Sequence, residues 1–174
     1  LDDIGLGALF HDIGMCDIEI EYNNIEIDKA SSQDKMLYRR HVIEGYEMIH
    51  NHEWIPDKVK LIVLSHHERE DGSGYPFHKK SERIPIEVKV VSVCDYFDEV
   101  VNGIGHRKRK VNEVVEYLRT VGTYMFDYAV VNKIITMCGG SPIYFLAEKK
   151  WFIFWIVVSD IWESAGWNSL IFIA

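Results

Sequence analysis

Side chains of the kinds that bind divalent metal ions are spread over the first hundred residues of this 174-residue chain. They are histidines and aspartates at the ends or on the inward faces of four expected helices: His11, Asp12, His41, His66, His67 and Asp95. Imidazole and carboxylate together suit Mn, Fe, Zn or Mg rather than an ion that prefers thiolates. These groups exceed what one ion needs and match a centre with two divalent ions, which can activate water and offset charge on phosphoryl oxygens. The sequence therefore predicts a hydrolytic metal centre.

Asp12 is the natural bridge between two ions, because a carboxylate has two oxygens to share and a neutral imidazole has one free nitrogen. His66 and His67 are neighbours near the end of an expected helix, where adjacent side chains point about 100° apart. They therefore suit two different ions, or one ligand and one supporting partner. A single His-Asp pair or a single helix histidine usually does not bind metal. Only the combination of all six residues in this order points to a metal centre.

Asp98 lies three residues after Asp95, so the two carboxylates are expected to share one helix face. A solvated helix edge is the alternative reading. The Val, Cys and Phe residues around the two aspartates disfavour it.

The elements that must position these residues are expected to be helices with short connections. Apolar spacing and helix-stop signals predict helices over residues 1–10, 33–51, 57–68, 86–102, 112–121 and 127–138. Gly14 is the expected stop of the first helix, and an acidic loop is expected over residues 16–31. The stretch from Val88 to Cys94 could be a strand, but its length and the spaced aspartates favour a helix. The fold class is all-α, a bundle of about five to seven helices with the metal centre between them.

The chain divides into one domain over residues 1–140 and an apolar, aromatic tail over residues 141–174. The tail is expected to be a packing helix, with an abnormal end of the sequence as the alternative. No uninterrupted apolar run approaches the roughly 20 residues that a membrane span needs. Because the chain opens at Leu1 in what reads as a helix, we expect a fragment of a longer protein.

Composition limits the class of partner. The formal net charge of -8 disfavours binding of duplex nucleic acid, which needs a basic face. It does not exclude a small anionic substrate, because bound metal ions can reverse the local charge. The scattered cysteines, Cys16, Cys94 and Cys138, fit reduced thiols and a cytoplasmic location.

Four segments together resemble the HD-GYP family of the HD superfamily of metal-dependent phosphohydrolases. They are His11-Asp12-Ile13-Gly14, the isolated His41, the run from His66 to Pro76 that ends in Gly74-Tyr75-Pro76, and Asp95-Tyr96-Phe97-Asp98. The resemblance implies a bacterial phosphodiesterase that hydrolyses cyclic di-GMP to pGpG or GMP with a two- or three-ion iron or manganese centre. It also implies sensor or receiver domains upstream and contact with diguanylate cyclase domains.

The resemblance also implies residue roles. The six histidines and aspartates would be metal ligands, with Asp12 and His67 also catalytic. The remaining roles would belong to the substrate rim and to residues that support the ligands: Gly74, Tyr75, Pro76 and Arg107 at the substrate, Glu68 and Asp98 behind the ligands.

Three positions depart from the family pattern. Met15 stands where a phosphate-facing Lys is usual, Ile104 replaces the first of two arginines while Arg107 remains, and Glu99 replaces an Ala. Losing one charged hydrogen bond to phosphate costs about 1.5–3 kcal/mol. The basic run over residues 106–110 could compensate, or it could be a solvated loop. Two further hypotheses therefore stay open: a module that binds metal and nucleotide with weakened catalysis, and a phosphohydrolase for another nucleotide.

Overall fold

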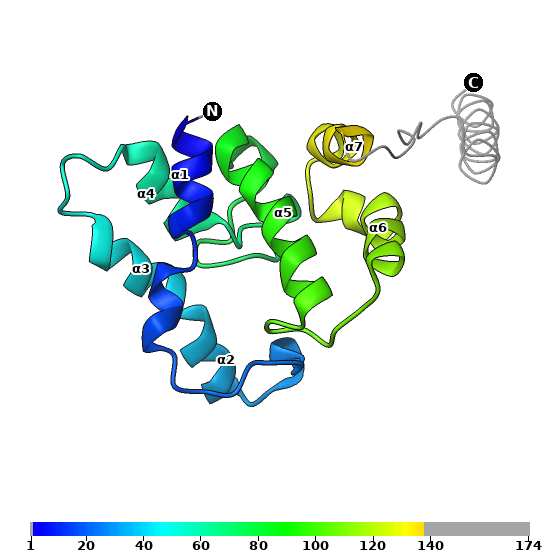
Figure 1. Ribbon diagram of the computed structural model, residues 1–174, viewed down its shortest axis with the longest axis horizontal. Helices are drawn as coiled ribbons and strands as arrows, with labels where there is room; N and C mark the ends of the chain where they lie inside the picture. The colour runs from blue at the N-terminus through cyan, green and yellow to red at the C-terminus, as the bar shows by residue number, and fades with distance from the viewer. Residues whose placement is uncertain (1, 138–174) are drawn as a thin grey trace, which may run out of the picture.

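The computed structural model describes residues 2–137. Its helices, shown in Figure 1, are α1 (Asp2–Phe10), α2 (Ser32–Arg39), α3 (His41–Ile49), α4 (Asp57–Ser65), α5 (Ile86–Asn102), α6 (Val111–Arg119) and α7 (Tyr128–Met137). Short 3-10 helices cover Ile13–Asp17, Ile27–Lys29, Ser81–Arg83 and Val121–Tyr124. The described part of the chain contains no strand, so the predicted all-α class is confirmed. The predicted domain boundary and the tail lie outside the described residues.

Helix α5 is the central element of the fold, with α1 to α4 on one side and α6 and α7 on the other (Figure 1). Its first half packs Val88 and Val91 against Ile62 of α4. From Val93 onward, it packs Val93 and Val100 in a cluster with residues of α6 and α7. A helix that is buried on several sides has apolar residues around most of its circumference. This explains why the valine-rich stretch that could have been a strand is helical.

The predicted single helix over residues 33–51 is wrong. Helix α2 ends at Arg39, and α3 begins at His41 after a turn at Arg40. No Gly or Pro marks this break in the sequence. At the break, the backbone of Gly14 approaches α3 so closely that a Cβ on Gly14 would lie 2.1 Å from the His41 carbonyl oxygen. Gly14 is therefore a packing position inside a 3-10 helix and not the predicted helix stop.

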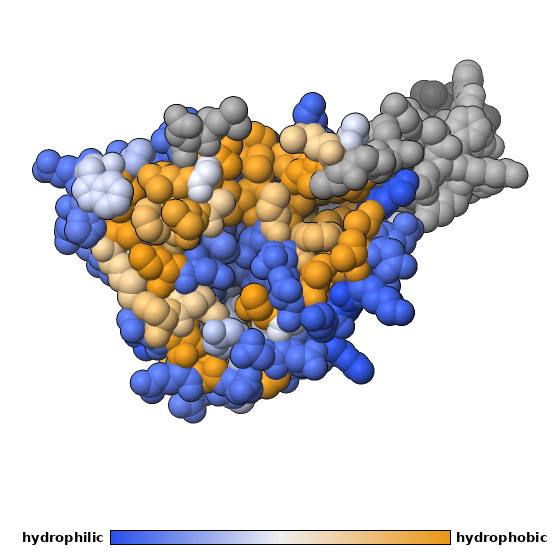
Figure 2. Space-filling model, in the orientation of Figure 1, coloured by the Kyte–Doolittle hydropathy of each residue, from blue (hydrophilic) through white to orange (hydrophobic). Residues whose placement is uncertain are grey.

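The loop before α2 closes over the loop that follows α5. The Ile27 N–H donates to the Gly105 carbonyl at 3.0 Å, and the Gly105 N–H donates to the Tyr22 carbonyl at 2.9 Å. Asn23 and Ile104 form an isolated antiparallel bridge between the same two loops. Figure 2, in the orientation of Figure 1, shows hydrophilic side chains gathered in the middle of the visible face of the molecule, with apolar surface on either side. Over residues 2–137, no helix has the length and apolar character needed to cross a membrane.

Candidate metal centre

Three histidines of the candidate centre are oriented by the ends of helices. His11 follows α1 directly, and His66 follows α4 directly, because α4 ends at Ser65 and not at the predicted residue 68. Their Nδ1 atoms donate to the carbonyls of Ala8 at 2.7 Å and Val63 at 2.9 Å. The last carbonyls of a helix have no partner inside the helix, so they are available as acceptors.

His41 is oriented in the same way by the end of α2, because its Nδ1 donates to the Tyr38 carbonyl at 2.7 Å. A hydrogen bond at one ring nitrogen sets the tautomer and leaves the other nitrogen as a lone pair. The Nε2 atoms of His11, His41 and His66 therefore face the interior of the site.

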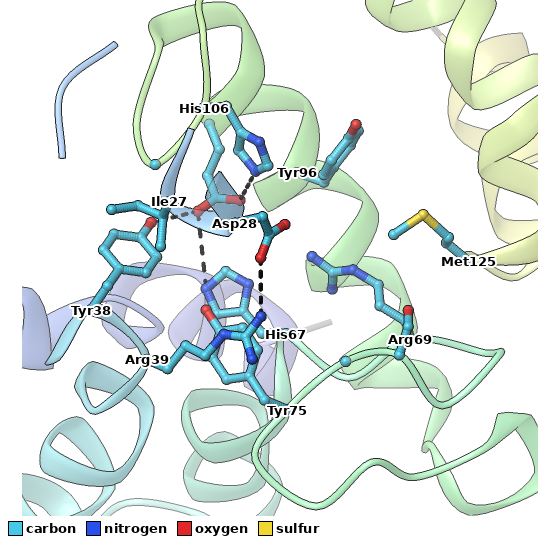
Figure 3. Close-up of a pocket in the computed structure, with 14 residues that line it drawn as sticks. Ile27, Asp28, Tyr38, Arg39, His67, Arg69, Tyr75, Tyr96, His106 and Met125 are labelled. Carbon is cyan, nitrogen blue, oxygen red and sulfur yellow. Dashed lines mark hydrogen bonds and ion pairs between the residues drawn. The ribbon is translucent and has the colours of Figure 1, made fainter. Parts of the chain in front are cut away.

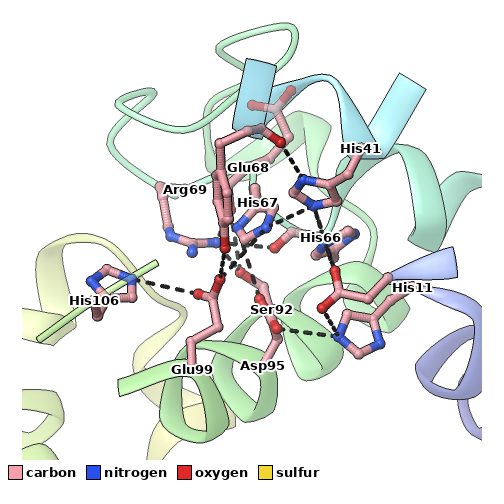
Figure 4. Close-up of polar contacts among 12 residues, drawn as sticks. His11, His41, His66, His67, Glu68, Arg69, Ser92, Asp95, Glu99 and His106 are labelled. Atoms are coloured by element: carbon pink, nitrogen blue, oxygen red, sulfur yellow. Dashed lines mark hydrogen bonds and ion pairs between the residues drawn. The ribbon is translucent and has the colours of Figure 1, made fainter. Parts of the chain in front are cut away.

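The facing Nε2 atoms suit a shared cation. His41 Nε2 lies 3.4 Å from His66 Nε2 and 3.1 Å from His67 Nε2 (Figure 4). When His41 and His66 are neutral and carry their single proton on Nδ1, their Nε2 atoms have no hydrogen to share and repel one another. Ligand atoms about 2.1 Å from one ion lie about 3.0 to 3.4 Å apart at octahedral or tetrahedral angles. The observed separations therefore fit a shared metal ion.

The two aspartates connect these histidines into overlapping groups. Asp12 Oδ1 lies 3.5 Å from the Nε2 atoms of His41 and His66, while its Oδ2 lies 3.5 Å from His11 Nε2. Asp95 Oδ1 lies 3.2 Å from the same His11 nitrogen. The described residues thus hold one potential metal-binding group of Asp12, His41, His66 and His67, and another of His11, Asp12 and Asp95. Asp12 belongs to both, as expected of a bridging carboxylate.

His66 and His67 can contribute to the same group, contrary to the expectation from helix geometry. Both residues lie beyond the last residue of α4, so the 100° spacing of a regular helix does not apply to them. Their rings lie with centroids 4.3 Å apart, and both present Nε2 to His41. All six sequence-predicted metal ligands converge in the structure.

The charge states of several ligands suit metal binding at neutral pH. Burial and, after it, the charge of His66 lower the pKa of His41 to about 4. Burial also lowers the pKa of His67 well below its usual value. Burial acts to raise the pKa of Asp12, but hydrogen bonding to His66 and the charges of the histidines outweigh it and hold this pKa at about 2. Two neutral imidazoles and an ionised carboxylate therefore face the centre.

His11 makes the metal-free protein sensitive to alkaline pH. Burial lowers its pKa, but the hydrogen bond with Asp95 and the charge of Asp12 dominate and raise it from 6.5 to about 9. A pKa raised by folding gives stability that is fully present below pH 6.5 and lost as the pH rises through about 9. We expect the melting temperature of chelator-treated protein to fall over this interval, and to fall less in His11→Gln. The exposed His52→Gln variant should follow the parent, and an identical fall in His11→Gln would contradict the prediction.

Glu68 supports the glycine-rich loop and not a metal ligand. Its carboxylate is buried and accepts hydrogen bonds from the N–H groups of Phe77 at 2.7 Å and Lys79 at 2.8 Å.

The predicted role of Asp98 behind the metal ligands is wrong. Its side chain is exposed and accepts a hydrogen bond from Asn102 at 2.9 Å, and Glu99 takes the buried position beside Asp95 instead.

The Gly-Tyr-Pro segment lies directly on the double histidine. The Tyr75 N–H donates to the His67 carbonyl at 3.2 Å, and the Tyr75 ring stacks on the His67 ring with centroids 4.7 Å apart. Gly74 packs against the backbone of residues 67–69, where a Cβ would lie 2.3 Å from the His67 carbonyl oxygen. Pro76 lines a neighbouring groove with Met36 and Ile43.

A pocket opens beside His67, and sequence reasoning missed much of its lining (Figure 3). Arg39 lies over the Tyr75 ring at 4.8 Å from its centroid and pairs with Asp28 at 3.0 Å. The buried Arg69 donates to Ser92 Oγ at 2.6 Å. The lining also includes aromatic rings, a carboxylate and an imidazole: Tyr38, Tyr75, Tyr96, Glu99 and His106.

Arg107, the predicted phosphate contact, is exposed, and the pocket lining has His106 in its place. Spacing could have identified Glu99, which lies one helical turn after Asp95. No signal in the sequence marks Arg39 or Arg69.

Known proteins resemble this chain over most of its described length. A family model described as HD domain matches residues 1–130. The cyclic di-GMP phosphodiesterase response regulator RpfG of Xanthomonas campestris pv. campestris is 30% identical over 134 residues, which cover 76% of this chain and 35% of that protein. A cyclic di-GMP phosphodiesterase of Pseudomonas aeruginosa is 32% identical over 106 residues, which cover 61% of this chain and 25% of that protein.

The fold is also that of a solved structure. Bd1817, an HDG"Y"P protein from Bdellovibrio bacteriovorus, superposes with a TM-score of 0.67 at 22% identity, covering 79% of this chain and 44% of that one. The chain spans well under half the length of these relatives. The family match covers residues 1–130, and the His-Asp and Gly-Tyr-Pro segments lie within it. The chain belongs to the HD domain family.

Proposed function

We propose that this chain carries the hydrolytic centre of a phosphodiesterase that converts cyclic di-GMP to pGpG or GMP. The observation that carries the proposal is the convergence of five metal-binding side chains on a sixth, Asp12. Two relatives that bear the name cyclic di-GMP phosphodiesterase support the choice of substrate. We further propose a bacterial cytoplasmic protein whose upstream sensor or receiver domain regulates this centre and whose Gly-Tyr-Pro rim meets diguanylate cyclase domains.

The cofactor would be two divalent ions, iron or manganese in preference to magnesium or zinc. When bound, such ions supply positive charge against phosphate oxygens and lower the pKa of a coordinated water. His41 and His66 would hold one ion and His11 and Asp95 the other. Asp12 would connect the two through its separate oxygens, and His67 lies where the centre meets the pocket.

The pocket supplies cations that the departures at Met15 and Ile104 remove. Arg39 and Arg69 line it, and the Arg69 guanidinium is held by the carbonyls of residues 66 and 68 as well as by Ser92. These groups would pair with the phosphates of a cyclic dinucleotide. Gly74 and Tyr75 would form the rim on the side of His67.

A second candidate function is a regulatory module that binds metal and nucleotide with little turnover. The buried Glu99 carboxylate lines the same pocket as His67 and adds negative charge where phosphates would approach. Together with Met15, this favours weaker substrate binding. A phosphohydrolase for another nucleotide is the third alternative.

Anaerobic purification of the 174-residue chain, a metal count and product chromatography with cyclic di-GMP would separate these functions. Linear product that disappears on chelation supports the proposal. Tight binding of cyclic di-GMP without product supports the regulatory module. Neither binding nor product would point to another nucleotide and overturn the proposed substrate.

A further inference from the structure

We infer that the groove beside the Gly-Tyr-Pro segment is a second part of the substrate site and takes one guanine base of the cyclic dinucleotide. The inference rests on the proposed function and extends it to a cavity that none of the predicted metal ligands lines. The groove lies between α2 and α3 on one side and the Gly-Tyr-Pro segment on the other. Its apolar, aromatic and cationic lining includes Lys35, Met36, Arg39, Ile43, Tyr75 and Pro76.

The pocket beside His67 is too small to hold a dinucleotide alone. Its cavity has a volume of about 180 Å³, whereas the groove has a volume of about 380 Å³. Cavities that bind small organic ligands usually have volumes of about 300–1,000 Å³. The pocket falls below this range, and the pocket and the groove together fall within it. A substrate with two nucleosides therefore needs space beyond the pocket, and the groove provides it.

Arg39 and Tyr75 line both cavities and join the groove to the metal centre (Figure 3). The Tyr75 ring stacks on the His67 ring with centroids 4.7 Å apart, and the Arg39 guanidinium carbon lies 4.8 Å from the centre of the Tyr75 ring. The groove is thus separated from a metal ligand by one aromatic ring. A cyclic dinucleotide with a phosphate at the metal centre can therefore place a base in the groove, with Arg39 at the junction.

Positive charge distinguishes the groove within an acidic chain of formal net charge -8. Among the described residues, its lining holds Lys35, Arg39 and Arg40 and no Asp or Glu. Two carboxylates outside the lining pair with the arginines, Asp28 with Arg39 and Glu44 with Arg40. The Lys35 ammonium donates to the Asp28 backbone carbonyl at 2.8 Å, a contact that leaves its charge unneutralised. The groove therefore suits a ligand group with hydrogen-bond acceptors.

This lining favours guanine over adenine. One edge of guanine presents the acceptors O6 and N7, whereas the same edge of adenine presents an amino donor beside N7. Lys and Arg side chains only donate, so they match the guanine edge and leave the adenine amino group without an acceptor. Met36, Ile43 and Pro76 supply apolar surface for the face of the base.

The first test places a carboxylate in the groove of the Mn²⁺-loaded, 174-residue chain. Met36→Glu should weaken the affinity for cyclic di-GMP by about tenfold or more, because the new charge opposes the acceptors of the base and the nearby phosphates. Met36 is 59% exposed, so the variant should fold, which circular dichroism checks. Ile86→Glu is the matched control, because Ile86 is 55% exposed at the start of α5 and lines neither cavity.

The second test addresses the choice of base. We expect the parent to prefer cyclic di-GMP to cyclic di-AMP by about tenfold or more. Lys35→Met keeps an unbranched side chain but loses the charge and the donors, so it should reduce this preference severalfold. Lys29→Met is the control, because the Lys29 side chain is 74% exposed and lines neither cavity.

Affinity is measured as KM where the chain hydrolyses the nucleotide and by calorimetry where it does not. Equal affinities of the parent and Met36→Glu for cyclic di-GMP would overturn the groove as a substrate site. An unchanged preference in Lys35→Met would overturn the recognition of guanine there. Hydrolysis by Met36→Glu with the parental KM would count against this inference alone, whereas groove-dependent binding without any product would count against the proposed function alone.

Discussion

Replacing Asp12 with asparagine is expected to abolish most hydrolysis and to remove at least one bound ion. Asp12 offers Oδ1 to His41 and His66 and Oδ2 to His11, each at 3.5 Å. Asparagine keeps one oxygen and places an NH₂ group, which is only a donor, at the other position. Changes to the partners behind metal ligands already cost about 10–100-fold in affinity or activity, so a bridging ligand should cost at least about a hundredfold.

Turnover of cyclic di-GMP and metal content should both be measured for this variant. Asp17→Asn is the matched control, because Asp17 is an exposed carboxylate in the 3-10 helix that follows Asp12. It should retain the ion count and rate of the parent. Unchanged turnover in Asp12→Asn would show that this carboxylate does not connect the ions.

Replacing Gly74 with alanine should give a large loss of stability. The added Cβ would lie 2.3 Å from the His67 carbonyl oxygen, 2.5 Å from the Arg69 nitrogen and 2.6 Å from the Glu68 Cα. All three are backbone atoms, so the loop must move. Movement would strain the hydrogen bonds that Glu68 accepts from Phe77 and Lys79. Overpacking and weakened charged hydrogen bonds together predict a loss of about 3 kcal/mol in the free energy of unfolding.

Chemical denaturation monitored by circular dichroism would measure this loss. Gly5→Ala is the control, because Gly5 lies in α1 and a Cβ there meets nothing within 4 Å. Alanine is favoured over glycine in a helix interior, so this variant should be unchanged or more stable by about 0.5–1 kcal/mol. Equal stabilities of the two variants would contradict the close packing of the loop on residues 67–69.

The helices and the ligand residues were accessible from the sequence for different reasons. Apolar spacing identified the helices because each buries one or more faces, and α5 was identified even though its valines also suit a strand. The ligands were accessible because histidines and aspartates are recognisable by type. His41 was predicted on an unbroken helix, yet it reaches the centre because the chain turns at Arg40. Gly14 packs against the His41 carbonyl at that turn, a contact that no local pattern records.

The remaining errors have a common physical origin. Asp98 was favoured over Glu99 because a spacing of three and a spacing of four both place residues on one helix face. Only the neighbours of α5 determine which of the two is buried. Arg39 and Arg69 were missed because their positions depend on the Tyr75 ring and on Ser92, which are distant in the sequence.

The junction of α1 with His11 and Asp12 couples the position of a whole helix to the metal centre. Helix α1 ends at Phe10, so both ligands follow its last turn without an intervening linker. Sliding a helix by one residue moves its end about 1.5 Å, whereas metal–ligand distances tolerate about 0.2 Å. A shift of α1 along its axis far smaller than one residue would therefore separate Asp12 from His41 and His66. Binding of metal ions by this centre would therefore depend on α1 keeping its position along its axis.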